Sequence, residues 1–164
     1  MSFHHISVEM FSSTELSRFM RIIAPLKAKA CFRGVFSIDT LPYSFSLPAT
    51  FIINNQTSNL PGEHWVCVYI DHLQRGEYAD SFAMPPPLKV SQWLTKVCNS
   101  WTWNKLCVQH MLSTACGAHV IFFAVKRPTC DSMNCVYALL PGRLIDNDKY
   151  VTLFIANVLS LSDN

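Results

Sequence analysis

The spacing of apolar positions predicts three amphipathic helices. Apolar side chains recur every third or fourth residue after Ser12, which begins a capping-box pattern, and this first helix is expected to end near Ala24 because a proline follows. The same spacing recurs over 89–100. A further helix is expected at the C-terminal end of the chain, capped near Asp146 or Asn147.

Runs of β-branched and aromatic residues predict the strands of a small sheet. These runs cover 31–38, 50–54, 64–71 and 77–82. The run at 64–71 is almost wholly apolar, as in a central strand, and a short turn joins it to 77–82 as a hairpin. Segment 101–109 is expected to be extended, whereas 131–143 fits neither pattern. The sequence therefore predicts an α+β fold, with a small, largely antiparallel sheet flanked by helices.

Length and composition indicate one soluble domain. The 164 residues suit a single domain, 1–164; half of them are hydrophobic and 15% are charged, which argues against disorder. The longest apolar run, 115–125, is too short to cross a bilayer, and the N-terminus lacks the pattern of a signal peptide. We therefore expect an intracellular protein that is neither secreted nor held in a membrane.

The charge distribution gives little support for nucleic-acid binding. The net charge is only +2, and the chain lacks the stripe of Lys and Arg that marks a nucleic-acid groove. A loose basic cluster near the first helix would allow a modest anionic contact; its members are Arg18, Arg21, Lys27, Lys29 and Arg33.

The cysteines are odd in number and scattered along the chain. The seven are Cys31, Cys67, Cys98, Cys107, Cys116, Cys130 and Cys135. This distribution is typical of reduced thiols rather than of a disulfide framework. Cys130 and Cys135 are spaced as half of a metal site, but no second pair stands at ligand spacing, so we expect no bound metal.

One of these cysteines stands where a thiolate would be favoured. A polar loop leads into Cys116, and an apolar, helix-compatible run follows it. The unpaired N–H groups and the dipole at a helix start favour negative charge on sulfur. Seven residues upstream, Gln109 carries an amide that could donate to a developing oxyanion. The alternative is that Cys116 is one more buried structural cysteine.

A cysteine nucleophile also needs a base and a group that orients the base. His64 opens the predicted central strand, and Asp80 lies near the end of its hairpin partner, so the hairpin would place them close together. The alternatives are a strand-end histidine without a role and an aspartate that forms a turn. His119, three residues after Cys116, is a competing base but is expected to face the core.

The order of four candidate residues along the chain resembles that of the active-site residues in adenain-like cysteine proteases; the four are His64, Asp80, Gln109 and Cys116. This family comprises the adenovirus endopeptidase group and its relatives that cleave ubiquitin-like proteins. His64-Trp65 matches the His-Trp that opens the central strand of that family. The other matching motifs are the acidic hairpin motif at 78–82, the oxyanion glutamine and the nucleophile loop at 113–117. The match covers roughly residues 14–125, and together these motifs favour a protease.

The resemblance implies an adenain-like fold and a cysteine endopeptidase. The catalytic residues would be Cys116, His64 and Asp80, the oxyanion would bind the Gln109 side chain and the Cys116 N–H, and Trp65 would pack beside the site, against the imidazolium. It also implies cleavage after glycine in viral precursor proteins or structural proteins. A monomer from a DNA virus or virus-like element, located in the virion and in the host nucleus or cytoplasm, is expected.

The resemblance leaves activation and substrate open. Adenovirus members are activated by DNA and by a peptide that bonds to a cysteine, and Cys98 stands where that cysteine would fall. Because the net charge is low, activation by DNA is expected less than activation by a peptide. The sequence does not indicate a required cofactor. Ala83 stands where relatives often carry glycine, which leaves the local turn open. The alternatives are a protease for ubiquitin or ubiquitin-like modifiers, an acyltransferase using the same Cys-His pair, and a non-catalytic interaction domain.

Overall fold

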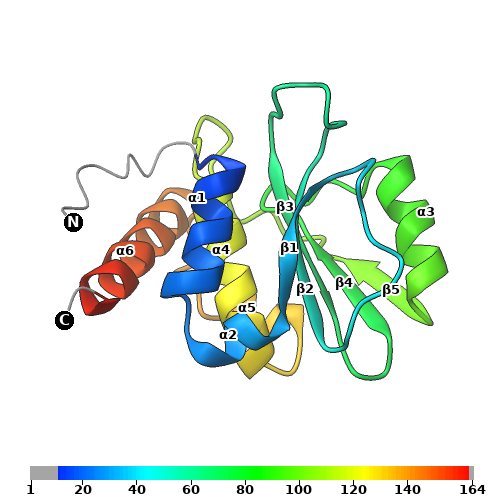
Figure 1. Cartoon of the computed structure of the whole chain (residues 1–164). Helices are drawn as coiled ribbons and strands as arrows, with labels where there is room; N and C mark the ends of the chain where they lie inside the picture. Colours follow the sequence, from blue (N-terminus) through cyan, green and yellow to red (C-terminus); the bar gives the residue numbers. More distant parts are fainter. Residues whose placement is uncertain (1–10, 163–164) are drawn as a thin grey trace.

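Five strands form one mixed sheet with helices on both of its faces (Figure 1). The computed structural model describes residues 11–162; the N-terminal residues on which the signal-peptide prediction depends lie outside this range. In their order across the sheet, the strands are β1 (Phe32–Ser37), β2 (Ala49–Asn54), β3 (Trp65–Ile70), β4 (Arg75–Ala79) and β5 (Ser100–Trp103). The segment expected to be extended over 101–109 is a strand only as far as Trp103.

The two central strand pairings are antiparallel and the two outer pairings are parallel. β3 and β4 form the expected hairpin, in which Cys67 lies opposite Ala79. β1 and β2 run parallel because segment 38–48 returns the chain to the starting end of the sheet, and a helix, α3 (Leu88–Val97), does the same between β4 and β5. The α+β class with flanking helices is confirmed, and the sheet is mixed because of these two crossover connections.

Most helices lie on one side of the sheet, as Figure 1 shows. They are α1 (Ser13–Arg18), η1 (Phe19–Ile23), α2 (Leu26–Cys31), α4 (Cys116–Lys126), η2 (Arg127–Thr129), α5 (Met133–Tyr137) and α6 (Leu144–Ser162). The expected first helix is therefore divided: α1 carries the capping box, in which Ser12 Oγ accepts from the Glu15 N–H at 3.2 Å, and it continues into a π-helical turn, η1. None of the helices within residues 11–162 combines the length and the apolar character that crossing a bilayer requires.

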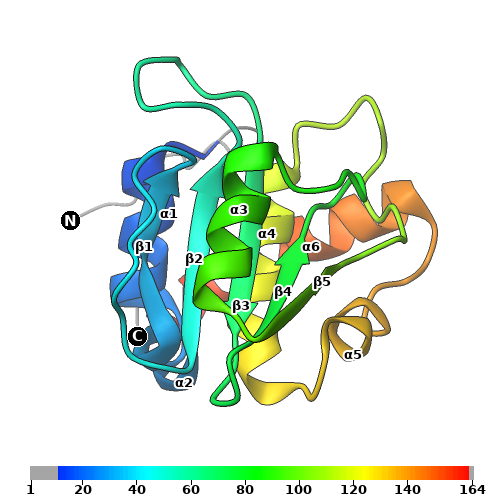
Figure 2. The ribbon, with the colours of Figure 1, turned by 90° about the vertical axis from the view of Figure 1, so that its right-hand side faces the viewer.

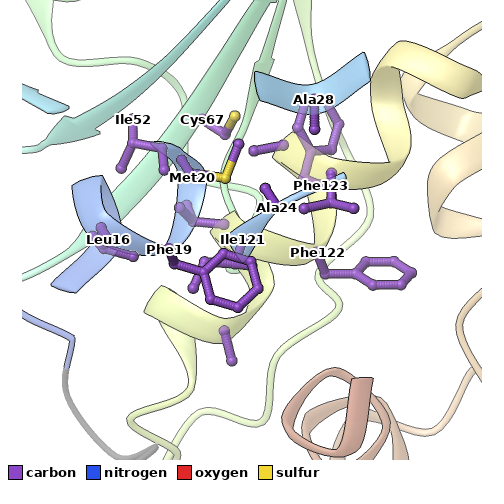
Figure 3. Close-up of a cluster of buried hydrophobic side chains, with 14 of the residues drawn as sticks. Leu16, Phe19, Met20, Ala24, Ala28, Ile52, Cys67, Ile121, Phe122 and Phe123 are labelled. Atoms are coloured by element: carbon purple, nitrogen blue, oxygen red, sulfur yellow. The ribbon is translucent and has the colours of Figure 1, made fainter. Parts of the chain in front are cut away.

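Helix α4, which begins with Cys116, lies at the centre of the larger core (Figure 3). Its residues from Gly117 to Val125 are all buried, because the helix packs between β3 and α6. α3 covers the opposite face of the sheet (Figure 2), where Trp93 packs edge-on against Phe51 with 5.1 Å between the ring centroids. The burial of α4 fixes its first residue, Cys116, near the beginning of β3.

Candidate active site

His64 and Asp80 meet at one end of the β3–β4 hairpin. His64 directly precedes β3 and Asp80 directly follows β4, so antiparallel pairing places them side by side. The imidazole Nε2 lies 3.1 Å from Asp80 Oδ1, and the two side chains are 13% and 3% exposed. Within the described part of the chain Nε2 has no aligned hydrogen bond, so this contact is chiefly an ion pair. The hairpin alone brings a titratable base and a buried carboxylate together.

Cys116 is the first residue of α4, and its sulfur lies against the same end of the hairpin. The His64 ring and the main-chain N–H groups of Trp65 and Gly117 lie close enough to stabilise negative charge on this sulfur. Burial raises the pKa of the Cys116 thiol, but these donors outweigh burial, so the pKa lies below the ordinary value for a thiol. The Trp65 N–H is a donor that the sequence pattern does not reveal, because it depends on how β3 meets α4.

The pKa of the His64 imidazole is shifted upward, opposite to that of the Cys116 thiol. Burial lowers the pKa of His64, but contact with the Asp80 carboxylate and with Cys116 outweighs burial and raises the pKa to about 9. Because the thiol pKa falls while the imidazole pKa rises, the proton of the pair is favoured on His64. The arrangement therefore favours a thiolate nucleophile beside an imidazolium that can donate a proton.

Asn104 holds the backbone of Asp80 from both sides. The Asp80 N–H donates to Asn104 Oδ1 at 2.8 Å, and Asn104 Nδ2 donates to the Asp80 carbonyl at 2.6 Å. Asn104 is buried and follows β5, so only the parallel pairing of β5 with β4 brings it to this position. Sequence reasoning missed this residue, since no local pattern predicts that pairing.

The turn after Asp80 fixes the direction of its carboxylate. The Phe82 N–H donates to Asp80 Oδ1 at 2.7 Å, and the Ala83 N–H closes the turn by donating to the Asp80 carbonyl at 2.9 Å. Ala83 has a φ of 60°, in the left-handed region that glycine adopts more readily. The turn therefore forms with alanine at this position.

Gln109 is fully buried, and its amide orientation is set by two hydrogen bonds. Ser81 Oγ donates to Gln109 Oε1 at 2.5 Å, and Gln109 Nε2 donates to the Ser113 carbonyl at 2.8 Å. The main-chain N–H of Gln109 also donates to the Ser81 carbonyl at 3.1 Å. An amide nitrogen carries two hydrogens, so Nε2 keeps one donor for a ligand in the cleft that Gln109 and Cys116 both line.

A cleft of about 850 Å³ runs past these residues. Figure 2 shows the loops before β3 and before α4 rising from the same end of the sheet. Residues from both loops line the cleft, and its lining includes His64, Trp65, Phe82, Gln109 and Cys116. Three of the four predicted residues, His64, Gln109 and Cys116, thus line one cavity that a polypeptide could enter, and Asp80 lies buried against His64.

The aromatic ring beside the imidazole belongs to Phe82. The His64 and Phe82 ring centroids are 5.2 Å apart, with 33° between the ring planes. Trp65, expected against the imidazolium, instead lines the cleft, and its indole N–H donates to the Phe11 carbonyl at 2.8 Å. Phe11 also packs on Gly117, where an added Cβ would lie 2.7 Å from its ring. The segment before α1 therefore contacts the first turn of α4, next to Cys116.

Comparison with known proteins gives structural matches. No protein-family model and no curated protein matches the sequence. The ASFV pS273R protease matches with a TM-score of 0.60 and 16% identity, over 89% of this chain and 67% of that chain. The SUMO protease Ulp1 matches with a TM-score of 0.54 and 13% identity, over 93% of this chain and 78% of that one. The Chlamydia trachomatis effector Cdu1, solved bound to ubiquitin, matches with a TM-score of 0.50 and 18% identity, over 65% and 51%.

The chain has a Ulp1-like cysteine-protease fold. This is the fold that the adenain resemblance implies. The chain spans only about half the length of the Cdu1 structure, at 51%, and 43% of another structure of the ASFV protease. Because the sequence identities are below 25%, these matches show the fold only. The activity of this chain has to be inferred from the residues of its own site.

Within this protease fold, Cys98 lies apart from the cleft that Cys116 and His64 line. It follows α3 and packs against Gly76 near the beginning of β4, whereas Asp80 follows the end of that strand. Burial raises the pKa of Cys98 to about 11, so its thiol is less acidic than an ordinary one. The structure does not bring Cys98 together with the other candidate residues.

The competing histidine has a partner of its own. His119 Nε2 lies 2.8 Å from Asp148 Oδ1, and both side chains are largely buried.

Two residues of the predicted basic cluster are hydrogen-bonded within the chain. Arg33 donates to main-chain carbonyls, including that of Pro48 at 2.8 Å, and Lys29 donates to the Ile22 carbonyl at 2.6 Å. Among residues 11–162, no three His, Cys, Asp or Glu side chains are grouped as metal ligands.

Proposed function

We propose that this chain is a cysteine endopeptidase. The carrying observation is that Cys116 at the start of α4, His64 and Gln109 line one cleft, with Asp80 buried against the His64 ring. The protease fold supports the assignment, and an interaction domain would not require a lowered thiol pKa next to a buried His–Asp pair.

The reaction proceeds through a thioester. The Cys116 thiolate attacks the carbonyl carbon of the scissile bond and forms a C–S bond, and the carbonyl oxygen becomes an oxyanion that accepts from the Cys116 N–H and Gln109 Nε2. The His64 imidazolium then gives its proton to the leaving amine as the C–N bond breaks. Neutral His64 next removes a proton from water, which attacks the thioester and releases the acid and the thiolate. Asp80 orients His64 and stabilises its charged form throughout.

The proposed substrates are viral precursor or structural proteins cleaved after glycine. Trp65 and Phe82 place bulky rings in the lining of the cleft close to the nucleophile, and such walls favour a residue without a side chain. The match to the ASFV protease supports a viral origin, with the virion and the host nucleus or cytoplasm as the site of action. We propose that the chain acts as a monomer.

A second candidate is the removal of ubiquitin or a ubiquitin-like modifier. Met111 and Leu112, on the loop between Gln109 and Cys116, are 81% and 90% exposed. Apolar side chains held in solvent beside a catalytic cleft suit contact with a folded protein substrate. The fold shared with Ulp1 and with Cdu1 supports this candidate.

The test is cleavage of a panel of glycine-containing peptides by the purified chain, in reducing agent. Cys116→Ala should abolish cleavage, and Cys135→Ala, which removes an exposed thiol, should leave cleavage unchanged. Cleavage by the Cys116→Ala variant would refute the assignment.

Other assays separate the alternatives. Reaction of the wild type with a ubiquitin C-terminal electrophile but with no peptide would favour the second candidate. Acetyl-CoA-dependent acylation would identify an acyltransferase, and failure of a thiol-reactive probe to label Cys116 at neutral pH would indicate a non-catalytic domain.

A further inference from the structure

The beginning of α6 is hydrogen-bonded to the segment that carries Gln109. Asn147 Nδ2 donates to the Val108 carbonyl at 2.9 Å, and the His110 N–H donates to Asp148 Oδ2 at 3.2 Å. These two contacts hold the residues immediately before and after Gln109. α6 lies outside the part of the chain that resembles the protease family in sequence, and nothing in the proposed reaction uses it.

Asp148 also connects this segment to the nucleophile helix. Its Oδ1 lies 2.8 Å from Nε2 of His119, which stands on α4 three residues after Cys116 and is 5% exposed. One carboxylate therefore contacts both the helix that begins with Cys116 and the backbone next to Gln109. Asp148 thus joins α4 to the segment that carries Gln109.

Asn147 is itself fixed in position. It is 1% exposed, and its Oδ1 accepts from the Gly142 N–H at 2.8 Å while its Nδ2 reaches Val108. On the opposite side of the segment, the Val108 and Gln109 N–H groups donate to the Ser81 carbonyl at 2.8 and 3.1 Å. The oxyanion segment is thus held between the end of β4 and the beginning of α6.

We propose that Asn147 and Asp148 are positioning residues, which set the Gln109 amide at the distance from Cys116 that binding of the oxyanion requires. The inference rests on the proposed protease function. A displaced oxyanion donor lowers the rate of acylation, because a shift of about 1 Å in a reacting group can cost on the order of a hundredfold. It does not change the thiolate, which depends on His64 and on the N–H groups at the start of α4.

The test uses Asn147→Asp, which keeps the size and the acceptor of the side chain but removes the donor to Val108. Its matched control is Asn157→Asp, the same substitution at an exposed position of the same helix. We expect Asn147→Asp to lower kcat for a cleaved peptide about tenfold or more with little change in KM. Alkylation of Cys116 by iodoacetamide, a displacement that forms no oxyanion, should keep its wild-type rate. The control should match the wild type in both assays.

A double-variant comparison separates positioning from general damage. In the Gln109→Ala background, Asn147→Asp should cost little further activity, because the group that it positions is already absent. A full additional loss, or a parallel loss of the alkylation rate, would overturn the proposal. Asp148→Asn, which loses one of its two contacts, serves as a second variant and should show the same pattern.

Hydrogen exchange tests the same contacts without any substrate. In the Asn147→Asp variant, amides of the segment 105–113 should exchange faster than in the wild type, while those of β2 and β3 should not. Unchanged exchange over 105–113 would overturn the proposal even if no peptide is cleaved. Cleavage by the wild type with equal cleavage by the variant would overturn this inference alone, whereas a wild type that cleaves nothing would count against the proposed function.

Discussion

Replacement of Asp80 by asparagine should narrow the pH range of activity from its alkaline side. The pKa of His64 near 9, against an ordinary value of 6.5, corresponds to about 3 kcal/mol in favour of the charged ring. Asp80 and Cys116 together supply this preference against the opposing effect of burial. Asp80→Asn removes one of the two groups that raise the pKa of the imidazolium, so this pKa should fall below about 9.

The direction of the change follows from which protonation state reacts. In the proposed reaction the imidazolium gives a proton to the leaving amine, so activity should fall as the pH rises through the pKa of His64. A lower pKa moves this alkaline limb to lower pH, and part of the activity remains because the thiol, the imidazole and the oxyanion donors are still present.

The assay is kcat/KM for a cleaved peptide measured across the pH range, with circular dichroism to confirm the fold. Asp131→Asn, which removes an exposed carboxylate, is the control and should leave the profile unchanged. An alkaline limb at the wild-type pH in Asp80→Asn would refute the role of Asp80 in stabilising the imidazolium.

Further predictions concern the oxyanion donor, the turn and a buried ion pair. Gln109→Ala should lower kcat by about a hundredfold or more, and an unchanged iodoacetamide alkylation rate will show that the nucleophile is intact. Ala83→Gly should raise the free energy of unfolding by up to about 1 kcal/mol in urea denaturation, because φ is 60° there; a decrease would contradict strain at this position. Glu77→Gln should lower that free energy by about 3 kcal/mol or more, because Arg127, which is 7% exposed, would lose its carboxylate partner. Arg143→Gln, at an exposed ion pair, should cost less than about 1 kcal/mol in the same measurement, and equal losses would contradict the effect of burial.

The elements of the fold could be predicted where a local pattern is sufficient. The capping box at Ser12, the apolar run of β3 and the spacing of α3 each reflect residues close together in the sequence, and each is present. The parallel pairing of β4 with β5 could not be predicted, since its direction depends on where α3 returns the chain. The π-helical turn at Phe19–Ile23 also carries no signal in the spacing of apolar residues, which suits an ordinary helix equally well.

The same distinction applies to the candidate site. His64 and Asp80 could be expected to meet because a short hairpin joins them, and the structure places them 3.1 Å apart. Asn104, Asn147 and Asp148 could not be found in this way, because each acts on a segment at least 24 residues away along the chain. The residues proposed to react can therefore be predicted from the sequence, whereas the residues that hold them in position cannot.

The contacts between the two halves of the site bear on activation. The hairpin supplies the proposed base and its carboxylate, and the segment leading to α4 supplies the proposed oxyanion donor and nucleophile. Ser81, which directly follows Asp80, accepts from the Gln109 N–H at 3.1 Å and donates from its hydroxyl to the Gln109 amide oxygen at 2.5 Å. The halves are thus joined by groups of this chain, so we expect cleavage without DNA and without an activating peptide. A large rise in kcat on adding either, lost in Cys98→Ser for the peptide, would show instead that the halves are aligned only when an activator binds.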